Sequence, residues 1–171
     1  MQTMTPDEAR VQLARLAGLA ARQSGLAFLR GLIENDEPLP MRQQLGLRPV
    51  EVEEGRAVFR LQPSPMLCNP VGGLHGGVYG VLLDSCMSCA VWTRCAPGQG
   101  YTTLEYKVNL VRGQNGEAAE IVGEGWVVHF GRRTATAEGK VYDARGRVLA
   151  HGSTTCILLD DFAVPASDLG G

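Results

Sequence analysis

An acidic residue, Asp84, interrupts an otherwise apolar stretch of helical length that runs from Val78 to Trp92. A charged carboxylate that is buried without a partner destabilises a fold by several kcal/mol, so its presence requires a reason. Partial burial also raises the pKa of a carboxyl group toward the range of a useful general base. We therefore interpret Asp84 as catalytic, with a buried, hydrogen-bonded structural acid as the alternative.

The segment before this stretch is rich in glycine and contains His75, Gly76 and Gly77 in succession. Glycine lets the backbone approach a ligand closely, because it lacks the Cβ that forbids some conformations. We expect Gly76 to begin a helix, where unpaired N–H groups and partial positive charge suit a developing oxyanion. A tight helix entry without a catalytic role is the alternative for Gly76 and Gly77.

The spacing of these two groups has a consequence for assembly. Gly76 and Asp84 are eight residues apart, which corresponds to about 12 Å along a helix axis. A reacting carbon must lie about 3 Å from both the attacking group and the oxyanion donors. One helix can hardly supply both groups, whereas two antiparallel helices related by a two-fold axis can. The spacing therefore predicts an obligate homodimer, in which Gly76 of one subunit faces Asp84 of the other.

Three neighbouring residues are further candidates for the same site. Ser88 lies four residues after Asp84 and shares its helical face, although a small residue that packs against a sheet has the same pattern. Asn69 is either a polar site residue or a turn-forming asparagine. His75 is either catalytic or orients the glycine turn.

The bulk composition limits the function classes. The chain has 171 residues, of which 44% are hydrophobic and 20% charged, and its formal net charge of -2 argues against a nucleic-acid binder. The N-terminal region lacks a signal-peptide pattern, and no segment suits a membrane span. The five cysteines show no disulfide spacing, and the pair Cys86 and Cys89 lacks the further ligands of a zinc site. We expect a cytoplasmic protein with buried thiols and no metal.

Hydrophobic periodicity and turn residues predict the elements that position the candidates. Two helices are expected near the N-terminus, followed by a tight hairpin at Glu54 and Gly55 and by the long apolar helix. Four strands follow, the first of which alternates strictly between apolar and polar residues. The predicted helices are 6–23, 25–35 and 76–94, and the predicted strands are 47–53, 57–62, 102–110, 121–130, 133–142 and 147–159.

These elements predict an α+β fold with an antiparallel sheet in meander order. A sheet that curls around the one long helix would bury that helix over its whole circumference, which explains why it has no polar face. We expect three parts: an N-terminal helical extension at 1–44, the main domain at 45–160 and a C-terminal tail at 161–171, which is expected to be frayed from residue 165 onward.

The helix motif resembles that of the hotdog-fold acyl-CoA thioesterases, and within them the phenylacetate-degradation (PaaI-like) type. The resemblance covers roughly residues 45–159 and includes the following strand and the closing hairpin. It implies a hotdog fold, an antiparallel sheet wrapped around one central helix. The motif residues are Asn69, Gly72, His75, Gly76, Gly77 and Asp84.

The resemblance also implies roles for individual residues. Asp84 matches the general base or nucleophile, and the Gly76 N–H matches the donor that polarises the thioester carbonyl. Asn69 matches the residue that holds the carbonyl or the water, and Ser88 matches a hydroxyl that assists the acid. A hydroxyl on the next strand, which is Thr102 or Thr103 here, helps to place the water.

The implied activity is hydrolysis of an aryl- or medium-chain acyl-CoA to the free acid and coenzyme A. No cofactor is expected, because coenzyme A is part of the substrate, and the implied assembly is a homodimer or a dimer of dimers. Arg112, Arg132 and Arg133 are candidates for contacts with the phosphates of coenzyme A, since guanidinium groups suit phosphate geometry. A solvated surface position is equally compatible with each arginine.

Two alternatives to hydrolysis stay open. The first is a hotdog dehydratase or hydratase that acts on 3-hydroxyacyl thioesters, although His75 leads into two glycines here, which disfavours it. The second is an acyl-CoA-binding hotdog domain without turnover, against which the intact set of Asn69, Gly76 and Asp84 argues.

Overall fold

The computed structural model describes residues 4–160, and its N-terminal part consists of three helices. These helices are α1 (Pro6–Ala20), α2 (Gly25–Glu34) and α3 (Pro40–Leu45). Side-chain oxygens of Thr5 and Ser24 cap the first two, as their positions before the helices favour. The predictions of α1 and α2 are confirmed, except that α1 ends at Ala20. The third helix was not predicted: Pro40 begins a helix instead of only breaking the chain.

The predicted strands are confirmed, with ends that differ from the predicted ones by at most two residues. The turn between the first two strands contains Gly55, whose φ of 78° lies in the left-handed region that favours glycine. The strands are β1 (Leu47–Glu53), β2 (Arg56–Leu61), β3 (Gly100–Leu110), β4 (Ile121–Phe130), β5 (Thr134–Tyr142) and β6 (Val148–Leu159).

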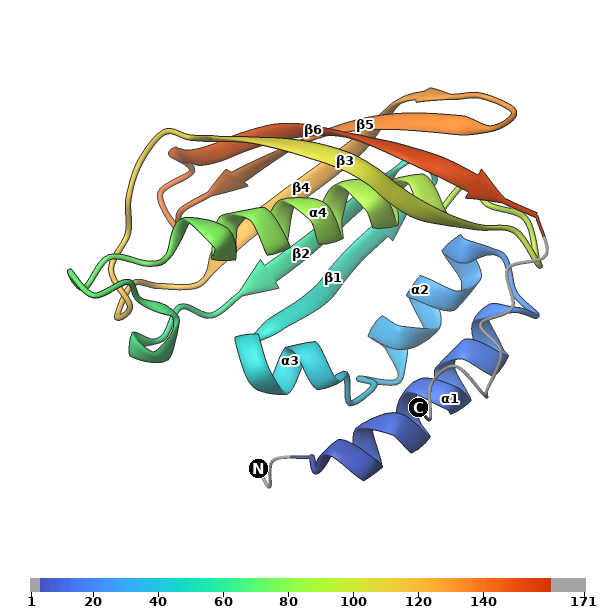
Figure 1. Cartoon of the computed structure of the whole chain (residues 1–171), viewed down its shortest axis with the longest axis horizontal. Helices are drawn as coiled ribbons and strands as arrows, with labels where there is room; N and C mark the ends of the chain where they lie inside the picture. The colour runs from blue at the N-terminus through green and yellow to red at the C-terminus, as the bar shows by residue number, and fades with distance from the viewer. Residues whose placement is uncertain (1–3, 161–171) are drawn as a thin grey trace.

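The six strands form one antiparallel sheet with the order β1-β2-β4-β5-β6-β3. The predicted meander order is therefore wrong for β3, which crosses to the far edge and pairs with β6 instead of β4. The long helix α4 (Gly76–Trp92) lies between β2 and β3 in the chain and carries it across the sheet (Figure 1). Strand order depends on contacts between distant segments, which periodicity does not report.

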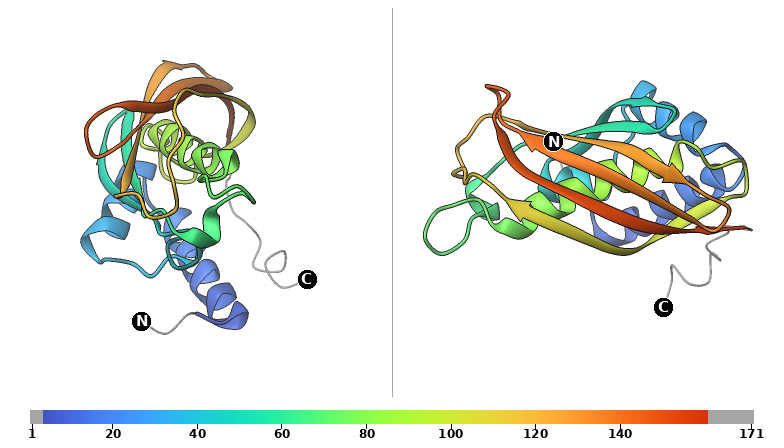
Figure 2. Two further views of the ribbon diagram at one scale, coloured as in Figure 1. Left: turned by 90° about the vertical axis from the view of Figure 1, so that its left-hand side faces the viewer. Right: turned by 90° about the horizontal axis from the view of Figure 1, so that it is seen from above.

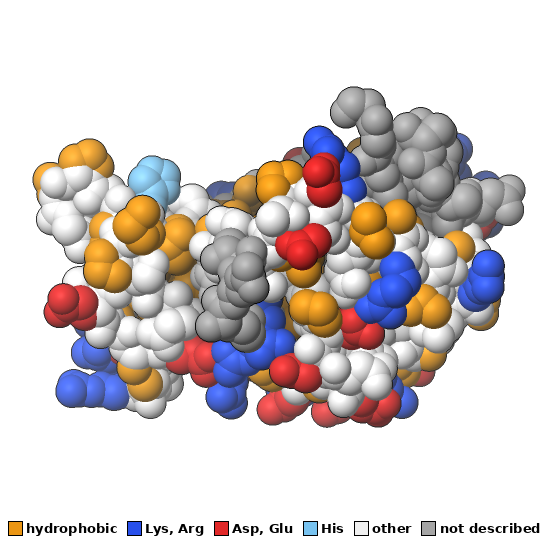
Figure 3. Space-filling model, turned by 90° about the horizontal axis from the view of Figure 1, so that it is seen from below, with side chains coloured by type: hydrophobic (Ala, Val, Ile, Leu, Met, Phe, Trp, Pro, Cys, Tyr) orange, Lys and Arg blue, Asp and Glu red, His pale blue; other side chains and the backbone are white. Residues whose placement is uncertain are grey.

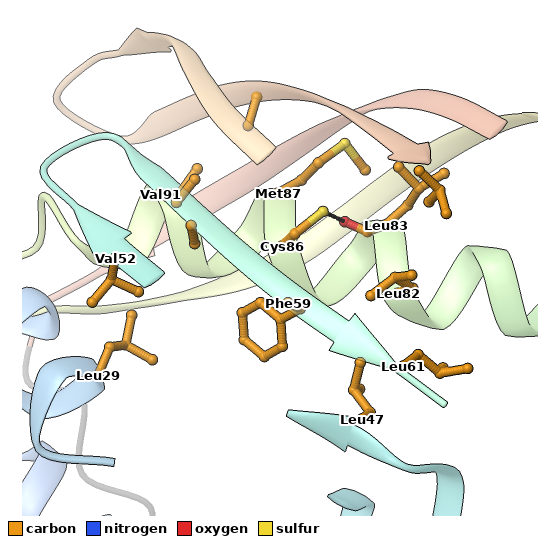
Figure 4. Packing of buried hydrophobic residues seen from close by; sticks show 14 of the residues in the cluster. Leu29, Leu47, Val52, Phe59, Leu61, Leu82, Leu83, Cys86, Met87 and Val91 are labelled. Atoms are coloured by element: carbon orange, nitrogen blue, oxygen red, sulfur yellow. Dashed lines mark hydrogen bonds between the residues drawn. The ribbon is translucent and has the colours of Figure 1, made fainter. Parts of the chain in front are cut away.

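The curved sheet packs over α4, as the end-on view shows (Figure 2). The residues of α4 that face the sheet are fully buried, and they include Leu82, Leu83, Cys86, Met87 and Val91 (Figure 4). These contacts confirm the predicted central helix. The prediction that the whole circumference is buried is wrong, because a strip of α4 that includes Gly77, Val81, Asp84, Ser85 and Cys89 stays partly or fully exposed.

The N-terminal helices lie on the opposite side of α4 from the sheet (Figure 1). Helices α2 and α3 pack against β1, and α2 also contacts α4. Seen from below, hydrophobic side chains are scattered among charged ones (Figure 3). Val11 is 72% exposed and Met41 45% exposed. Among the described residues, no helix has the length and apolar character needed to cross a membrane.

Candidate active site

The N-terminus of α4 presents an unpaired backbone donor at Gly76. His75 is the N-cap residue, and its Nδ1 accepts a hydrogen bond from the Gly77 N–H at 3.0 Å. Within residues 4–160, the Gly76 N–H has no hydrogen-bond acceptor. A Cβ at position 76 would lie 2.9 Å from Cδ1 of Leu110, so glycine fits this tight entry. The capping by His75 thus leaves the Gly76 N–H as the donor that faces outward from the helix.

Asn69 organises the loop that leads into α4. Its Oδ1 accepts hydrogen bonds from the N–H groups of Val71 and Gly73, both at 3.1 Å. The backbone N–H of Asn69 donates to the Gly73 carbonyl at 2.8 Å. The carboxamide oxygen is therefore used within the loop, as expected of a turn-forming asparagine. Among the described residues the Nδ2 amide group has no acceptor, so it remains the part of Asn69 that can meet a ligand.

Asp84 lies on the partly exposed strip of α4, and its Oδ1 accepts a hydrogen bond from the Thr103 hydroxyl at 3.1 Å. Burial raises the pKa of Asp84 above its ordinary value of 3.8, and the hydrogen bond from Thr103 opposes this shift. Within residues 4–160, no lysine or arginine pairs with this carboxylate. Its Oδ2 also has no partner there. The arrangement is that of a carboxylate with a raised pKa and one free oxygen.

A β-bulge in β3 explains why Thr103, and not Thr102, reaches Asp84. The register between β3 and β6 shifts between Thr103 and Glu105, so that Leu104 is an extra residue in β3. Thr103 faces α4 before the bulge, whereas Tyr106 faces it afterwards and packs against Gly80. The strict alternation predicted for 102–110 is therefore wrong. Thr102 is exposed on the outer face.

Ser88 is oriented by a residue that sequence reasoning missed. The side chain of Ser88 is buried, and its Oγ accepts a hydrogen bond from the Tyr101 hydroxyl at 3.1 Å. Tyr101 lies one residue before the predicted strand 102–110, so the alternating pattern did not include it. Its aromatic character is the only sequence signal that could have identified it as a site residue. On the α4–β3 seam, Thr103 contacts Asp84 and Tyr101 contacts Ser88, one helical turn further on.

The three arginine candidates do not come together in one chain. Arg112 follows the end of β3, where the neighbouring Leu110 pairs with Ala150 near the start of β6. Arg132 and Arg133 precede β5 near the other end of β6, where the Leu158 N–H donates to the Arg133 carbonyl. All three are exposed. They cannot contact the same phosphate group within one subunit, because about ten residues of strand, roughly 30 Å, separate them.

The cysteines are free thiols in or near the core. Burial raises the pKa of Cys89 to about 12 and that of Cys95 to about 11, and it raises the pKa of Cys86 further. No group of three His, Cys, Asp or Glu residues in the described part of the chain could hold a metal ion. The chemistry available at the site is thus that of Asp84, the hydroxyls beside it and the Gly76 N–H.

The chain is similar to known proteins in sequence and in fold. The family model described as "Thioesterase superfamily" matches residues 71–150. A 1,4-dihydroxy-2-naphthoyl-CoA hydrolase of Listeria monocytogenes is 28% identical over 109 residues, which are 64% of this chain and 87% of the relative. The proofreading thioesterase EntH of Klebsiella pneumoniae is 29% identical over 126 residues, which are 74% of this chain and 88% of the relative.

Among solved structures, the PaaI protein of the E. coli phenylacetic acid degradation operon superposes with a TM-score of 0.67. It is 17% identical, and the match covers 87% of this chain and 97% of PaaI. The hotdog fold predicted from the helix motif is confirmed. The chain has the hotdog fold, it matches the thioesterase superfamily model over residues 71–150, and PaaI is among its structural neighbours.

Proposed function

We propose that the protein hydrolyses an acyl-CoA thioester at sites shared between two subunits, with Asp84 as general base or nucleophile. The observation that carries this proposal is the pairing of a half-buried carboxylate, held through one oxygen by Thr103, with an unpaired N–H at the start of the same helix. The relatives that bear thioester-hydrolase names support the reaction class.

Residues on α4 and β3 have separate roles in the proposed reaction. A water molecule, activated by the free Oδ2 of Asp84, attacks the thioester carbon, or Oδ2 itself attacks to form an anhydride that water then opens. In both cases the Gly76 N–H donates to the oxyanion and the carbon–sulfur bond breaks. In the first route Oδ2 takes the proton of the attacking water and passes it to the departing thiolate of coenzyme A. In the second route the thiolate leaves as the anhydride forms, and it takes its proton from the water that opens the anhydride. Nδ2 of Asn69 is available to hold the carbonyl or the water. Ser88 supports the site through its hydrogen bond with Tyr101.

The distance between Gly76 and Asp84 is the reason for proposing a site shared between two subunits. Gly76 and Asp84 lie at opposite ends of about two helical turns, roughly 12 Å. A two-fold axis level with Gly80 brings the partner subunit's Gly76 to Asp84, and Asp84 to the partner's Gly76.

The edge of the sheet supports the same dimer. β3 is an edge strand that packs on α4, whereas α2 and α3 pack against β1 at the opposite edge of the sheet. It exposes large apolar side chains on and just after the strand, a pattern that edge strands of monomers avoid. Leu104 is 57% exposed, Tyr106 45%, Leu110 58% and Val111 57%. We infer that a second copy covers this edge in a homodimer, which itself can pair as a dimer of dimers.

Mixed dimers test the proposal. Gly76→Pro removes the N–H donor, and proline suits the first position of a helix after the extended His75, whose ψ is 135°. The Cβ that proline adds meets only the end of the flexible Leu110 side chain, which can move aside. Gly76→Pro and Asp84→Asn homodimers each lose the machinery at both sites. A heterodimer of the two variants keeps one complete site if the sites are shared.

Coexpression of the two variants should therefore restore roughly a quarter of the wild-type rate of thiol release, because half of the dimers are mixed and each holds one intact site. The separately expressed variants serve as controls. A mixture as inactive as its components would refute the shared site, and a wild-type protein that releases thiol from no acyl-CoA would refute the hydrolase.

A further inference from the structure

Helix α2, which lies outside the region matched by the family model, packs against α4. Its first residue, Gly25, donates its N–H to the Cys95 carbonyl at 3.1 Å. A Cβ at Gly25 would lie 1.9 Å from the carbonyl oxygen of Trp92, so α2 and the end of α4 are in direct backbone contact. This contact fixes α2 against the C-terminal end of α4.

Three aromatic rings meet at this contact. The Phe28 side chain is buried, and its ring centroid lies 4.9 Å from that of Trp92. The Trp92 and Tyr101 centroids are 5.9 Å apart in an edge-on arrangement. The Tyr101 hydroxyl reaches back to Ser88. We call Phe28, Trp92 and Tyr101 the aromatic stop.

The proposed dimer determines which part of α4 the acyl group can use. When the partner subunit's Gly76 lies at Asp84, the two helices run side by side only from residue 76 to residue 84. Beyond Asp84 the partly exposed residues of α4 are Ser85, Cys89 and Trp92, which share one helical face. An acyl group that starts at Asp84 therefore extends along this face toward the aromatic stop.

We propose that the aromatic stop sets an upper limit on acyl length, and that Phe28 of α2 is its specificity-determining residue. This inference rests on the proposed thioesterase function. The Cα of Trp92 lies about 12 Å beyond that of Asp84 along the helix axis. Helical side chains lean toward the N-terminus, so the Trp92 ring lies closer to Asp84 than its Cα does. An extended chain advances about 1.2 Å per bond, so acyl groups of roughly eight carbons, or one aromatic ring on a short linker, fill the space.

The test compares thiol release from a series of acyl-CoA substrates: butyryl, hexanoyl, octanoyl, dodecanoyl, palmitoyl and phenylacetyl. In the wild type, kcat/KM for dodecanoyl-CoA should be at least about tenfold below that for hexanoyl-CoA. Phe28→Ala should reverse or abolish this preference, because it opens the end of the site. Phe28→Leu should shift it in the same direction by a smaller factor.

Leu32→Ala is the matched control, since Leu32 is one turn further along α2, packs against the core and adjoins β1. This variant should keep the dodecanoyl-to-hexanoyl ratio within about twofold of the wild type. A wild type that hydrolyses long and short chains equally well overturns the inference, whether or not the variants fold. Folded Phe28 variants with a wild-type profile also overturn it, whereas the absence of turnover on every substrate overturns the thioesterase proposal itself.

Discussion

Replacing Thr103 by Val tests whether Asp84 works through the ionised state that its neighbour stabilises. Thr103 donates a hydrogen bond to Oδ1 of Asp84 at 3.1 Å, and this bond lowers a pKa that burial raises. Valine has nearly the same shape as threonine but cannot donate. The substitution therefore raises the pKa of Asp84, and activity that needs the carboxylate moves to higher pH.

The size of the shift follows from the bond. A hydrogen bond to a charged group contributes about 1.5–3 kcal/mol, and one pKa unit corresponds to about 1.4 kcal/mol. Asp84 is only partly buried, so water replaces part of the lost interaction. We expect the acid limb of the kcat/KM profile to move up by roughly half a unit to one unit, with a smaller change on the plateau.

The assay is thiol release as a function of pH, with circular dichroism at each pH to show that the protein stays folded. Thr102→Val is the control, because Thr102 is exposed on the outer face of the sheet. Thr103→Ser keeps the hydroxyl and should restore the wild-type profile. The reasoning fails if Thr103→Val leaves the acid limb in place, or if Thr102→Val moves it equally.

Two further predictions concern the buried groups of α4. Asp84→Asn should lower kcat by about a hundredfold or more and yet raise the melting temperature at neutral pH. The pKa of Asp84 is raised in the fold, so its ionisation destabilises the native state, and the stability advantage of the variant should disappear as the pH falls below 3.8. Thermal unfolding of both proteins across this pH range measures the advantage. A variant that is less stable than the wild type at neutral pH contradicts the prediction. The thiols of Cys86 and Cys95 are buried, and burial raises the pKa of both, that of Cys95 to about 11. They should resist alkylation in mildly alkaline buffer until denaturant is added, and rapid labelling of both in the native protein would contradict their buried positions.

Local patterns predicted most of the elements. The hairpin turn at Gly55 depends on residues within a few positions of each other, so the sequence alone predicts it. Apolar runs likewise revealed α4 and its exceptional acid, Asp84. Helix α3 was missed because it has only six residues, which are too few to show a periodic pattern. Its first residue, Pro40, was therefore interpreted as a break in the chain.

Contacts between distant segments escaped prediction. β3 pairs with β6, about fifty residues away along the chain, and the bulge at Leu104 depends on that pairing. Next to the bulge, the Thr154 hydroxyl donates to the Glu105 carbonyl at 2.8 Å. Nothing in the alternating segment signals this bond. The choice between Thr102 and Thr103, and the contact of Tyr101 with Ser88, therefore required the structure.

The bulge at Leu104 gives β3 two phases within one strand. Odd-numbered residues before it face α4, whereas even-numbered residues after it do. The first phase carries the hydroxyls that meet Asp84 and Ser88, and the second carries the apolar side chains that pack on the glycines at the start of α4. A one-residue insertion or deletion in this strand would turn the side chains beyond it to the opposite face of the sheet. Before Leu104 it would remove the hydroxyls from Asp84 and Ser88, and after Leu104 it would remove the apolar side chains from the glycines of α4.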